Sequence, residues 1–334
     1  MKRRLRGVAI GALLLLLAVE LVLGWPALAG ALRQLRTPHP GWLVLATGVE
    51  LGAMNAYARM QRHLLRSAGV RASIVEHLKL AYAAHSLSAT LPGGPAFSTR
   101  FNFQQMRRLG ASPAVASWAI ALSGILSACA LAALTLASAV AAGGAAEWHH
   151  LAWLLGGAVA LVLAVRHVSR HPAIFRPALA LFNRLRRRPA TDGRDRIPAF
   201  LAQLRAARLS AGHAVAAAGL ALLNWTLDAL CLWLCFRAVG ERPAALTVVL
   251  LAFCAAMAAG TITIVPGGLG IIDSALILGL VAGGVGAAPA VAAVVLYRVI
   301  SFGFIVALGW LSWLRLRTPA RALESRGGVA EALG

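Results

Sequence analysis

Charged side chains interrupt several long apolar stretches of this sequence, and their types are suited to binding a charged ligand. Asp228 follows Asn224 at the spacing of one helical turn, near the middle of an apolar stretch. Asp273 comes soon after a Pro-Gly-Gly sequence, and Arg298 directly follows Tyr297. A buried charge is costly unless a group of opposite charge accompanies it. We therefore expect Asp228, Asp273 and Arg298 to form a buried charge cluster, and we count Asn224 and Tyr297 among the candidate ligand-binding residues.

Two interpretations of this cluster are open. In the first, the charges form a structural ion pair that joins two helices. In the second, Arg298 and Arg100 contact an anionic phosphate, because a guanidinium donates two parallel hydrogen bonds to such a group. Asp228 and Asp273 would then orient the arginines or bind a coupling proton.

Sequence signatures of catalysis and of metal binding are scarce. We find no nucleophile elbow, phosphate-binding loop, zinc-protease helix or dinucleotide fingerprint. Cys231 and Cys235 share a helix face without a convincing histidine partner, so we expect them to be core residues. The acids Asp228 and Asp273 alone are weak support for an intramembrane transferase. We expect no catalytic residue, no cofactor and no metal.

The composition indicates that membrane helices must position these residues. Hydrophobic residues make up 60% of the 334 residues and charged residues 13%, whereas soluble proteins are about half apolar and a quarter charged. The net charge of +21 comes mainly from arginines that cluster between apolar stretches. Such clusters mark cytoplasmic loops, and no aromatic residues alternate with them as in nucleic-acid-binding proteins. We therefore predict an all-α, polytopic membrane bundle and no nucleic-acid partner.

The helix that carries Asp273 is predicted to follow a break in an apolar segment. The sequence Pro266-Gly267-Gly268 should end a helix that begins near Leu246, since proline lacks a backbone donor and glycine adopts unusual dihedral angles. A new helix should start near Gly270, which places Asp273 in its first turn. Inside a membrane such a break lines a wet cavity or is covered by protein. The alternative is a simple turn at the membrane surface.

The first half of the sequence contains a similar break. Pro92-Gly93-Gly94 lies between the apolar segments of the first half. Its place there is similar to that of Pro266-Gly267-Gly268 in the second half. Paired interruptions of this kind are a sequence pointer to the binding site of a transporter. The pattern indicates an internal duplication, and a chance match is the alternative.

Apolar segments of sufficient length predict about eight spans, and the segment before Pro92 is expected to dip into the membrane and return. The expected spans are 8–28, 42–64, 114–141, 151–168, 213–236, 244–265, 271–285 and 290–314. A secretory signal is the alternative for the first. The basic clusters place both termini and the loop 169–212 in the cytoplasm. The membrane domain then covers 1–314, with halves 1–168 and 213–314 as parallel repeats, and 315–334 form a tail. An inverted repeat would require an interrupted segment to cross.

Two stretches of the sequence resemble the motifs of a known family. One runs from Val265 to Asp273 and is followed by a last helix with Tyr297 and Arg298. The other is 91–94, together with Arg100 and 107–112. They are similar to conserved motifs of the lysylphosphatidylglycerol synthase transmembrane-region family, also called the flippase-like domain family.

The chain departs from the family pattern at both motifs. The family usually has Glu where this chain has Asp273, so the charge is kept in a shorter form. The earlier motif often has Arg and Gly-Glu where this chain has Gly94, Pro95 and Phe97, so the first acid is missing. A mechanism that needs both acids is therefore not implied.

The resemblance implies a membrane protein that handles lipids. In the bifunctional members aminoacylation belongs to a separate soluble domain, and the resemblance here covers the membrane part, so we expect no synthase activity. We hypothesise a translocator that moves an anionic phospholipid or polyprenyl-linked lipid between leaflets of the bacterial inner membrane. One alternative is an intramembrane enzyme acting on a lipid-linked sugar or phosphate. Another is a scaffold that binds a partner enzyme of the cytoplasm or membrane through the basic loop.

Overall fold

The computed structural model describes residues 38–143, 209–242, 244–260 and 266–317, and all regular elements in these ranges are helices. The all-α prediction is confirmed for this part of the chain. Three helices are long and apolar enough to cross a membrane, Pro113–Ala141, Ala211–Ala238 and Ala287–Leu316, which supports the membrane class. The predicted spans 8–28 and 151–168, most of the loop 169–212 and nearly all of the tail lie outside the described residues.

The helices follow one another along the chain with short connections in each described range. In order they are α2 (Pro40–Ser67), α3 (Ile74–Thr90), α4 (Gly94–Arg108), α5 (Pro113–Ala141), α9 (Ala211–Ala238), α10 (Leu246–Gly260), the short η2 (Pro266–Gly268), α11 (Ile271–Ala282), α12 (Ala287–Arg298), the π-helical η3 (Val299–Phe304) and α13 (Ile305–Arg317).

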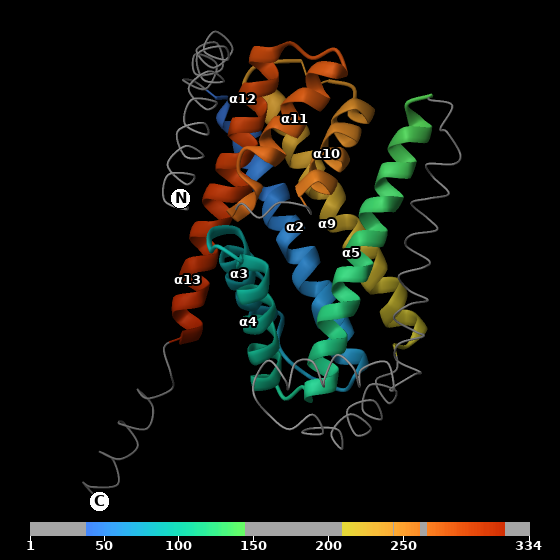
Figure 1. The fold of residues 1–334 in the computed structure, drawn as a ribbon, viewed down its shortest axis with the longest axis vertical. Helices are drawn as coiled ribbons and strands as arrows, with labels where there is room; N and C mark the ends of the chain where they lie inside the picture. Colours follow the sequence, from blue (N-terminus) through green and yellow to red (C-terminus); the bar gives the residue numbers. More distant parts are fainter. Residues whose placement is uncertain (1–37, 144–208, 243, 261–265, 318–334) are drawn as a thin grey trace, which may run out of the picture.

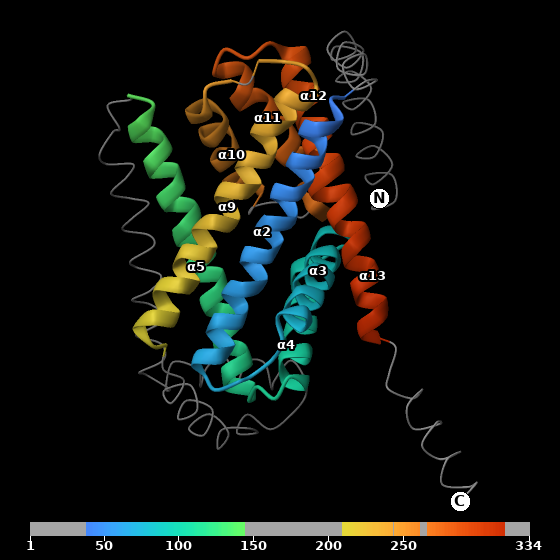
Figure 2. The same ribbon diagram turned by 180° about the vertical axis from the view of Figure 1, so that it is seen from behind.

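Helices α2 and α9 form the centre of the bundle and run antiparallel along their whole length (Figure 2). At one end the His39 N–H donates to the Ala238 carbonyl over 2.8 Å. At the other end the Nδ1 atoms of His63 and His213 lie 3.0 Å apart. Alanines of both helices are fully buried, and such small side chains let membrane helices approach closely. The register of this pair is therefore fixed from end to end.

Two helical hairpins pack around this central pair, at opposite ends of the bundle (Figure 1). The first consists of α3 and α4, and the second of α10 and α11. Ile272 lies against Gly260 at the start of α11, and Val248 lies against Gly283 after its end, so α10 and α11 are antiparallel. The predicted helix start after Gly270 is confirmed, because α11 begins at Ile271.

The tips of the two hairpins meet in the middle of the bundle. At Gly267, in the tip of the second hairpin, a Cβ atom would lie 3.1 Å from the Ala89 carbonyl oxygen at the end of α3. The same atom would collide with the ring of Phe302. Gly267 has a φ of 66°, a conformation that favours glycine. The second Pro-Gly-Gly sequence is thus packed between the first hairpin and η3.

Left-handed glycines recur at equal intervals in the two halves. Gly93 and Gly267 are separated by the same number of residues along the chain as Gly110 and Gly284. All four glycines have positive φ. Helices α2 and α9 have 28 residues each, and such a glycine follows two residues after each of them. The order of long helix, hairpin and long helix therefore occurs twice. The first set is α2, α3–α4 and α5, and the second is α9, α10–α11 and α12–α13.

The two sets are turned over relative to one another, because α2 and α9 run antiparallel. The sequence suggests parallel halves and leaves an inverted repeat as the alternative. The recurring glycines align α2 with α9. The sequence contains these glycines, but their left-handed conformation is visible only in the structure.

Basic residues gather at one end of the bundle. The C-terminal ends of α2 and α13, the turn between α4 and α5 and the first turn of α9 lie at this end (Figures 1 and 2). The last two turns of α2 carry Arg62 and Arg66, the last turn of α4 carries Arg107 and Arg108, and the end of α13 carries Arg315. The arrangement agrees with a common side for the described basic clusters, and the cytoplasmic assignment of that side stays a prediction.

Candidate functional site

An ion pair joins Asp273 to Arg298 beside the second hairpin tip. Asp273 is the third residue of α11, and its Oδ2 accepts the Gly270 N–H over 2.8 Å. Its Oδ1 accepts a hydrogen bond from Nε of Arg298, the last residue of α12 before η3. π-Helical turns within α-helices are frequent at functional sites. The predicted place of Asp273 in the first turn of a new helix is confirmed.

Arg298 keeps an unused hydrogen-bond donor next to this pair. Its Nη2 is buried and has no partner among the described residues, although the side chain as a whole is 16% exposed. A buried donor without a partner is unfavourable, and an anionic group satisfies it through a charge-assisted hydrogen bond. The pair can therefore present a fixed positive group to an anionic ligand.

Asp228 of α9 lies near this pair and has two polar neighbours. The Tyr297 hydroxyl donates to Asp228 Oδ1 over 2.6 Å. Glu50 of α2 lies beside Asp228, and its side chain is only 5% exposed. The charge of Arg298 is close enough to act on Asp228. The structure thus brings together Asp228, Asp273 and Arg298, which the sequence predicts as one cluster.

Glu50 is the member of this cluster that the sequence does not single out. It becomes visible only when the antiparallel register of α2 and α9 places it opposite Asp228. The available signal was the lack of a basic residue three or four positions away on its own helix. An acid in an apolar helix without such a neighbour needs a partner on another helix.

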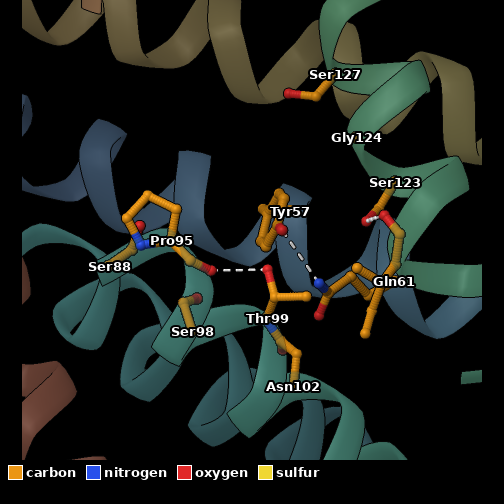
Figure 3. Close-up of a pocket in the computed structure, with 11 residues that line it drawn as sticks. Tyr57, Gln61, Ser88, Pro95, Ser98, Thr99, Asn102, Ser123, Gly124 and Ser127 are labelled. Carbon is orange, nitrogen blue, oxygen red and sulfur yellow. Dashed lines mark hydrogen bonds between the residues drawn. The ribbon is translucent and has the colours of Figure 1, made fainter. Parts of the chain in front are cut away.

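A second polar group surrounds a pocket of about 250 Å³ in the first half of the chain (Figure 3). The pocket lies between α2, α4 and α5, and Ser88 at the end of α3 also borders it. Gln61 Nε2 donates to the Tyr57 hydroxyl over 3.1 Å, and the Thr99 hydroxyl donates to the Pro95 carbonyl over 2.7 Å. None of the described residues that line this pocket carries a charged side chain. Sequence patterns gave no sign of it.

Two predicted site residues stand apart from the charge cluster. Asn224 is half-buried on α9, one turn before Asp228. Arg100 is exposed on α4, and no hydrogen bond or ion pair joins it to another described residue. The structure does not bring Arg100 to Arg298, so its role at a phosphate stays a prediction. Among the described residues no group of three or more His, Cys, Asp or Glu side chains is arranged to hold a metal ion.

The predicted backbone breaks interrupt helices in both hairpins. Gly93 is the left-handed residue that precedes α4, and a Cβ at Gly94 would collide with the Ser88 carbonyl. In the second hairpin Gly267, Gly268 and Gly270 all have positive φ. The described part of α10 ends at Gly260, α3 ends at Thr90, and residues 261–265 lie outside the described residues, so the exact start of the predicted break at Pro266 stays a prediction.

The family model described as the lysylphosphatidylglycerol synthase TM region matches residues 5–309, which include both hairpins, the charge cluster and the uncharged pocket. No curated protein matches the chain.

Proposed function

The chain belongs to the lysylphosphatidylglycerol synthase TM region family, and we propose that it is a lipid translocator of the bacterial inner membrane. Its substrate carries an anionic headgroup, as in a phospholipid or a polyprenyl-linked lipid. It moves this headgroup between the leaflets without changing it chemically. Membrane lipids are its partners, and both termini lie in the cytoplasm.

The observation that carries the proposal is the unpaired donor of Arg298. Asp273 holds the guanidinium through Nε, which leaves Nη2 free for a ligand. A phosphate oxygen is a suitable acceptor, since hydrogen bonds between two charged groups are about twice as strong as neutral ones. Because Asp273 is itself fixed by the Gly270 N–H, the arginine is positioned before the ligand arrives.

The two hairpins support a path for the headgroup. Within the described residues helices α10 and α11 have 15 and 12 residues, fewer than the roughly 20 that a crossing requires. We infer that both hairpins enter the membrane from opposite sides and return, and that the halves are an inverted repeat. Transporters of this design bind substrate near the membrane midplane, at the interrupted helices.

With returning hairpins the number of membrane crossings is smaller, but the chain termini lie on the same side of the membrane as before. The predicted spans 244–265 and 271–285 become one returning hairpin, and the crossings 8–28, 42–64, 114–141, 151–168, 213–236 and 290–314 remain. Two crossings are removed together, so both termini stay on the same side of the membrane. The described arginine clusters also stay on that side.

The proposal is tested by transfer of labelled lipids in liposomes that contain the purified protein. We expect faster transfer of phosphatidylglycerol carrying a fluorescent acyl chain than in empty liposomes. Arg298→Gln should slow this transfer roughly 10- to 100-fold, the equivalent of one hydrogen bond to a charged group. Arg108→Gln, which changes an exposed arginine at the end of α4, is the matched control and should transfer normally.

Two results would contradict the proposal. One is the absence of accelerated transfer for every anionic lipid tried, and the other is full activity of Arg298→Gln. Since that variant leaves Asp273 without its partner, the double variant with Asp273→Asn distinguishes lost binding from lost folding. Its melting temperature should be close to that of the wild type while transfer stays low.

A second candidate function is an enzyme that acts on a lipid-linked sugar or phosphate. The observation that favours it is the buried pair of Glu50 and Asp228, since adjacent carboxyl groups can act as acid and base. Mass spectrometry of lipids from cells with and without the protein decides between the two functions. A new or lost lipid species supports the enzyme, whereas unchanged species with altered leaflet distribution support the translocator.

A further inference from the structure

The pocket between α2, α4 and α5 has the properties of a second ligand site. Two of its side chains, Gln61 and Asn102, are 1% and 7% exposed. The amide oxygens of both have no hydrogen-bond partner among the described residues. Both side chains line the pocket (Figure 3). A ligand with hydrogen-bond donors would satisfy them, because buried acceptors without partners are unfavourable.

The hydroxyl groups of the lining present acceptors as well. The Thr99 hydroxyl uses its proton on the Pro95 carbonyl, and the Ser123 hydroxyl uses its proton on the Ile120 carbonyl. Each oxygen therefore keeps lone pairs for a ligand. The Tyr57 hydroxyl accepts from Gln61 Nε2 and lies beside the Ser123 hydroxyl. The described lining thus offers several acceptors together with the amide protons of Gln61 and Asn102, and none of its side chains is charged.

This combination selects an uncharged group rather than a cation. A buried ammonium would need a carboxylate partner, and the lining in the described part of the chain contains no acid. Hydroxyl groups of a sugar or a glycerol both donate and accept, which suits the mixture around Tyr57 and Gln61. The volume of about 250 Å³ is close to the lower end of typical small-molecule sites and is suited to a single headgroup.

The repeated architecture relates this pocket to the charge cluster. Thr99 and Asp273 stand at the same distance along the chain from the two Pro-Gly-Gly sequences. Gly124 and Arg298 stand at the same position from the starts of α5 and α12. The first half therefore has a hydroxyl and an open space where the second half has an acid and an arginine.

A second pair of positions follows the same rule. Tyr57 and Asp228 are equally far from the starts of α2 and α9, and Ser123 and Tyr297 are equally far from the starts of α5 and α12. Tyr57 lies beside Ser123, as Asp228 lies beside Tyr297. This contact is thus made in both halves, with uncharged groups in the first.

From these observations we propose that the pocket binds an uncharged, hydroxyl-rich group, such as the sugar or glycerol of a lipid headgroup. The proposal rests on the proposed function only for the statement that the bound group is moved across the membrane. Together with the anion site at Arg298, it identifies the substrate class as lipids that carry hydroxyl groups beyond a phosphate. The two sites then recognise different parts of the headgroup.

The test is binding of defined lipids to the full chain in phosphatidylcholine nanodiscs, measured by native mass spectrometry. The probes are monoglucosyl diacylglycerol, which is uncharged and rich in hydroxyl groups, and phosphatidic acid, which has only the phosphate. Diacylglycerol gives the baseline. We expect the glucosyl lipid to bind at least about ten times more tightly than the baseline, as one or two added hydrogen bonds would give.

Substitutions in the two sites should act on different probes. Gly124→Leu fills the pocket, and a Cβ atom at this position has open space around it, so the helix tolerates the change. It should weaken binding of the glucosyl lipid about tenfold and leave phosphatidic acid unchanged. Arg298→Gln should do the reverse. Gly219→Leu, at an exposed position of α9 that is equally open, is the control and should change neither.

The proposal is wrong if the glucosyl lipid binds no better than diacylglycerol, or if Gly124→Leu behaves like Gly219→Leu. Tighter binding of a lysyl-bearing lipid than of the glucosyl lipid, lost in Gly124→Leu, would also overturn it. If Gly124→Leu has a lowered melting temperature, the variant Thr99→Val is used in its place. This substitution removes one hydroxyl at nearly constant volume.

Free methyl glucoside distinguishes the source of the bound group. Competition with the glucosyl lipid would support a pocket for a soluble polyol, and its absence would support a lipid headgroup. Either result upholds binding of hydroxyl groups at this pocket. Because the readout is binding, a negative result in the liposome transfer assay would contradict translocation and leave this conclusion intact.

Discussion

The two halves of the described chain build the same arrangement of helices and place different chemistry at matching positions. In the second half Asp273 and Arg298 pair beside the hairpin tip, and in the first half Thr99 and Gly124 leave an uncharged pocket. Glycines with positive φ break both hairpins after a proline. The repeated backbone thus places side chains at matching positions in the two halves. The types of these side chains determine whether each place is charged.

The hairpin tips differ in how closely they are packed. At Gly93 a Cβ atom would meet nothing within 4 Å, whereas at Gly267 it would collide with Phe302 and approach the Ala89 carbonyl. Both residues are left-handed, with φ of 68° and 66°. The first tip is therefore constrained by its own backbone, and the second is constrained also by the other half of the bundle.

The largest effect is expected from alanine at these two glycines. Gly93→Ala should cost about 1 to 2 kcal/mol of unfolding free energy, from the left-handed conformation alone. Gly267→Ala should cost about 2 to 5 kcal/mol, because steric overlap in a packed site adds roughly 1 to 3 kcal/mol. Denaturant unfolding of the purified variants in one detergent measures the difference. Gly48→Ala, in an open helical position, should change little.

Equal losses for Gly93→Ala and Gly267→Ala would break this comparison. They would mean that the tip of the second hairpin is no more constrained by packing than the first. A larger loss for Gly93→Ala would have the same meaning. The contact between the two hairpins at Ala89 would then contribute nothing to stability.

A smaller effect is expected at the matching polar positions. Asp273→Asn leaves the Arg298 guanidinium without its charge partner, which costs about 3 to 5 kcal/mol for a fully buried pair. The side chain of Arg298 is 16% exposed and that of Asp273 is 25% exposed, so we expect a loss of about 2 to 3 kcal/mol here. Thr99→Val should cost under about 1 kcal/mol, since only one hydrogen bond of an exposed hydroxyl is lost.

The same unfolding assay tests this difference. The double variant Asp273→Asn, Arg298→Gln should regain most of the stability, because no unpaired charge remains. If Asp273→Asn is as stable as the wild type, the charge of Asp273 does not hold Arg298. The contrast between the two halves would then lie in their ligands alone and not in their stability.

Local rules made the position of the charge pair predictable from sequence. The break at Pro266 and the start of α11 follow from proline and glycine chemistry. Asp273 in the first turn follows from that start. Its meeting with Arg298 follows from the cost of leaving either charge alone in an apolar environment. Each step uses residues close in sequence or a strong preference for opposite charge.

The remaining site residues depend on packing that no local rule contains. Glu50 joins the cluster because the register of α2 on α9 places it opposite Asp228. The sequence shows Gly124 only as a small residue in an apolar helix. Its position at the pocket is recognised once the structure shows that Arg298 is its counterpart in the other half. Arg100 illustrates the converse, since its charge alone selected it, and the structure leaves it exposed on α4. Register and symmetry are properties of the assembled bundle.

The starts of the hairpins give the smallest expected effect, and it depends on pH. The Ser73 backbone N–H and hydroxyl donate to Glu76 at the start of α3, and these bonds lower the pKa of Glu76. A lowered pKa in the folded state means that the charged form stabilises the fold. This contribution is fully present above the pKa of the unfolded chain, which lies near 4.3. It is lost as the pH falls through the lower pKa of the folded protein.

Glu76→Gln should therefore have a lower melting temperature than the wild type at pH 7, and the difference should shrink below about pH 4. The carboxylate is exposed, so the stabilisation is expected to be under about 1 kcal/mol. The two proteins are compared by thermal unfolding in the same detergent over this pH range. A difference that is constant with pH would show that the carboxylate charge of Glu76 plays no part. The start of the first hairpin would then depend on the Ser73 cap alone.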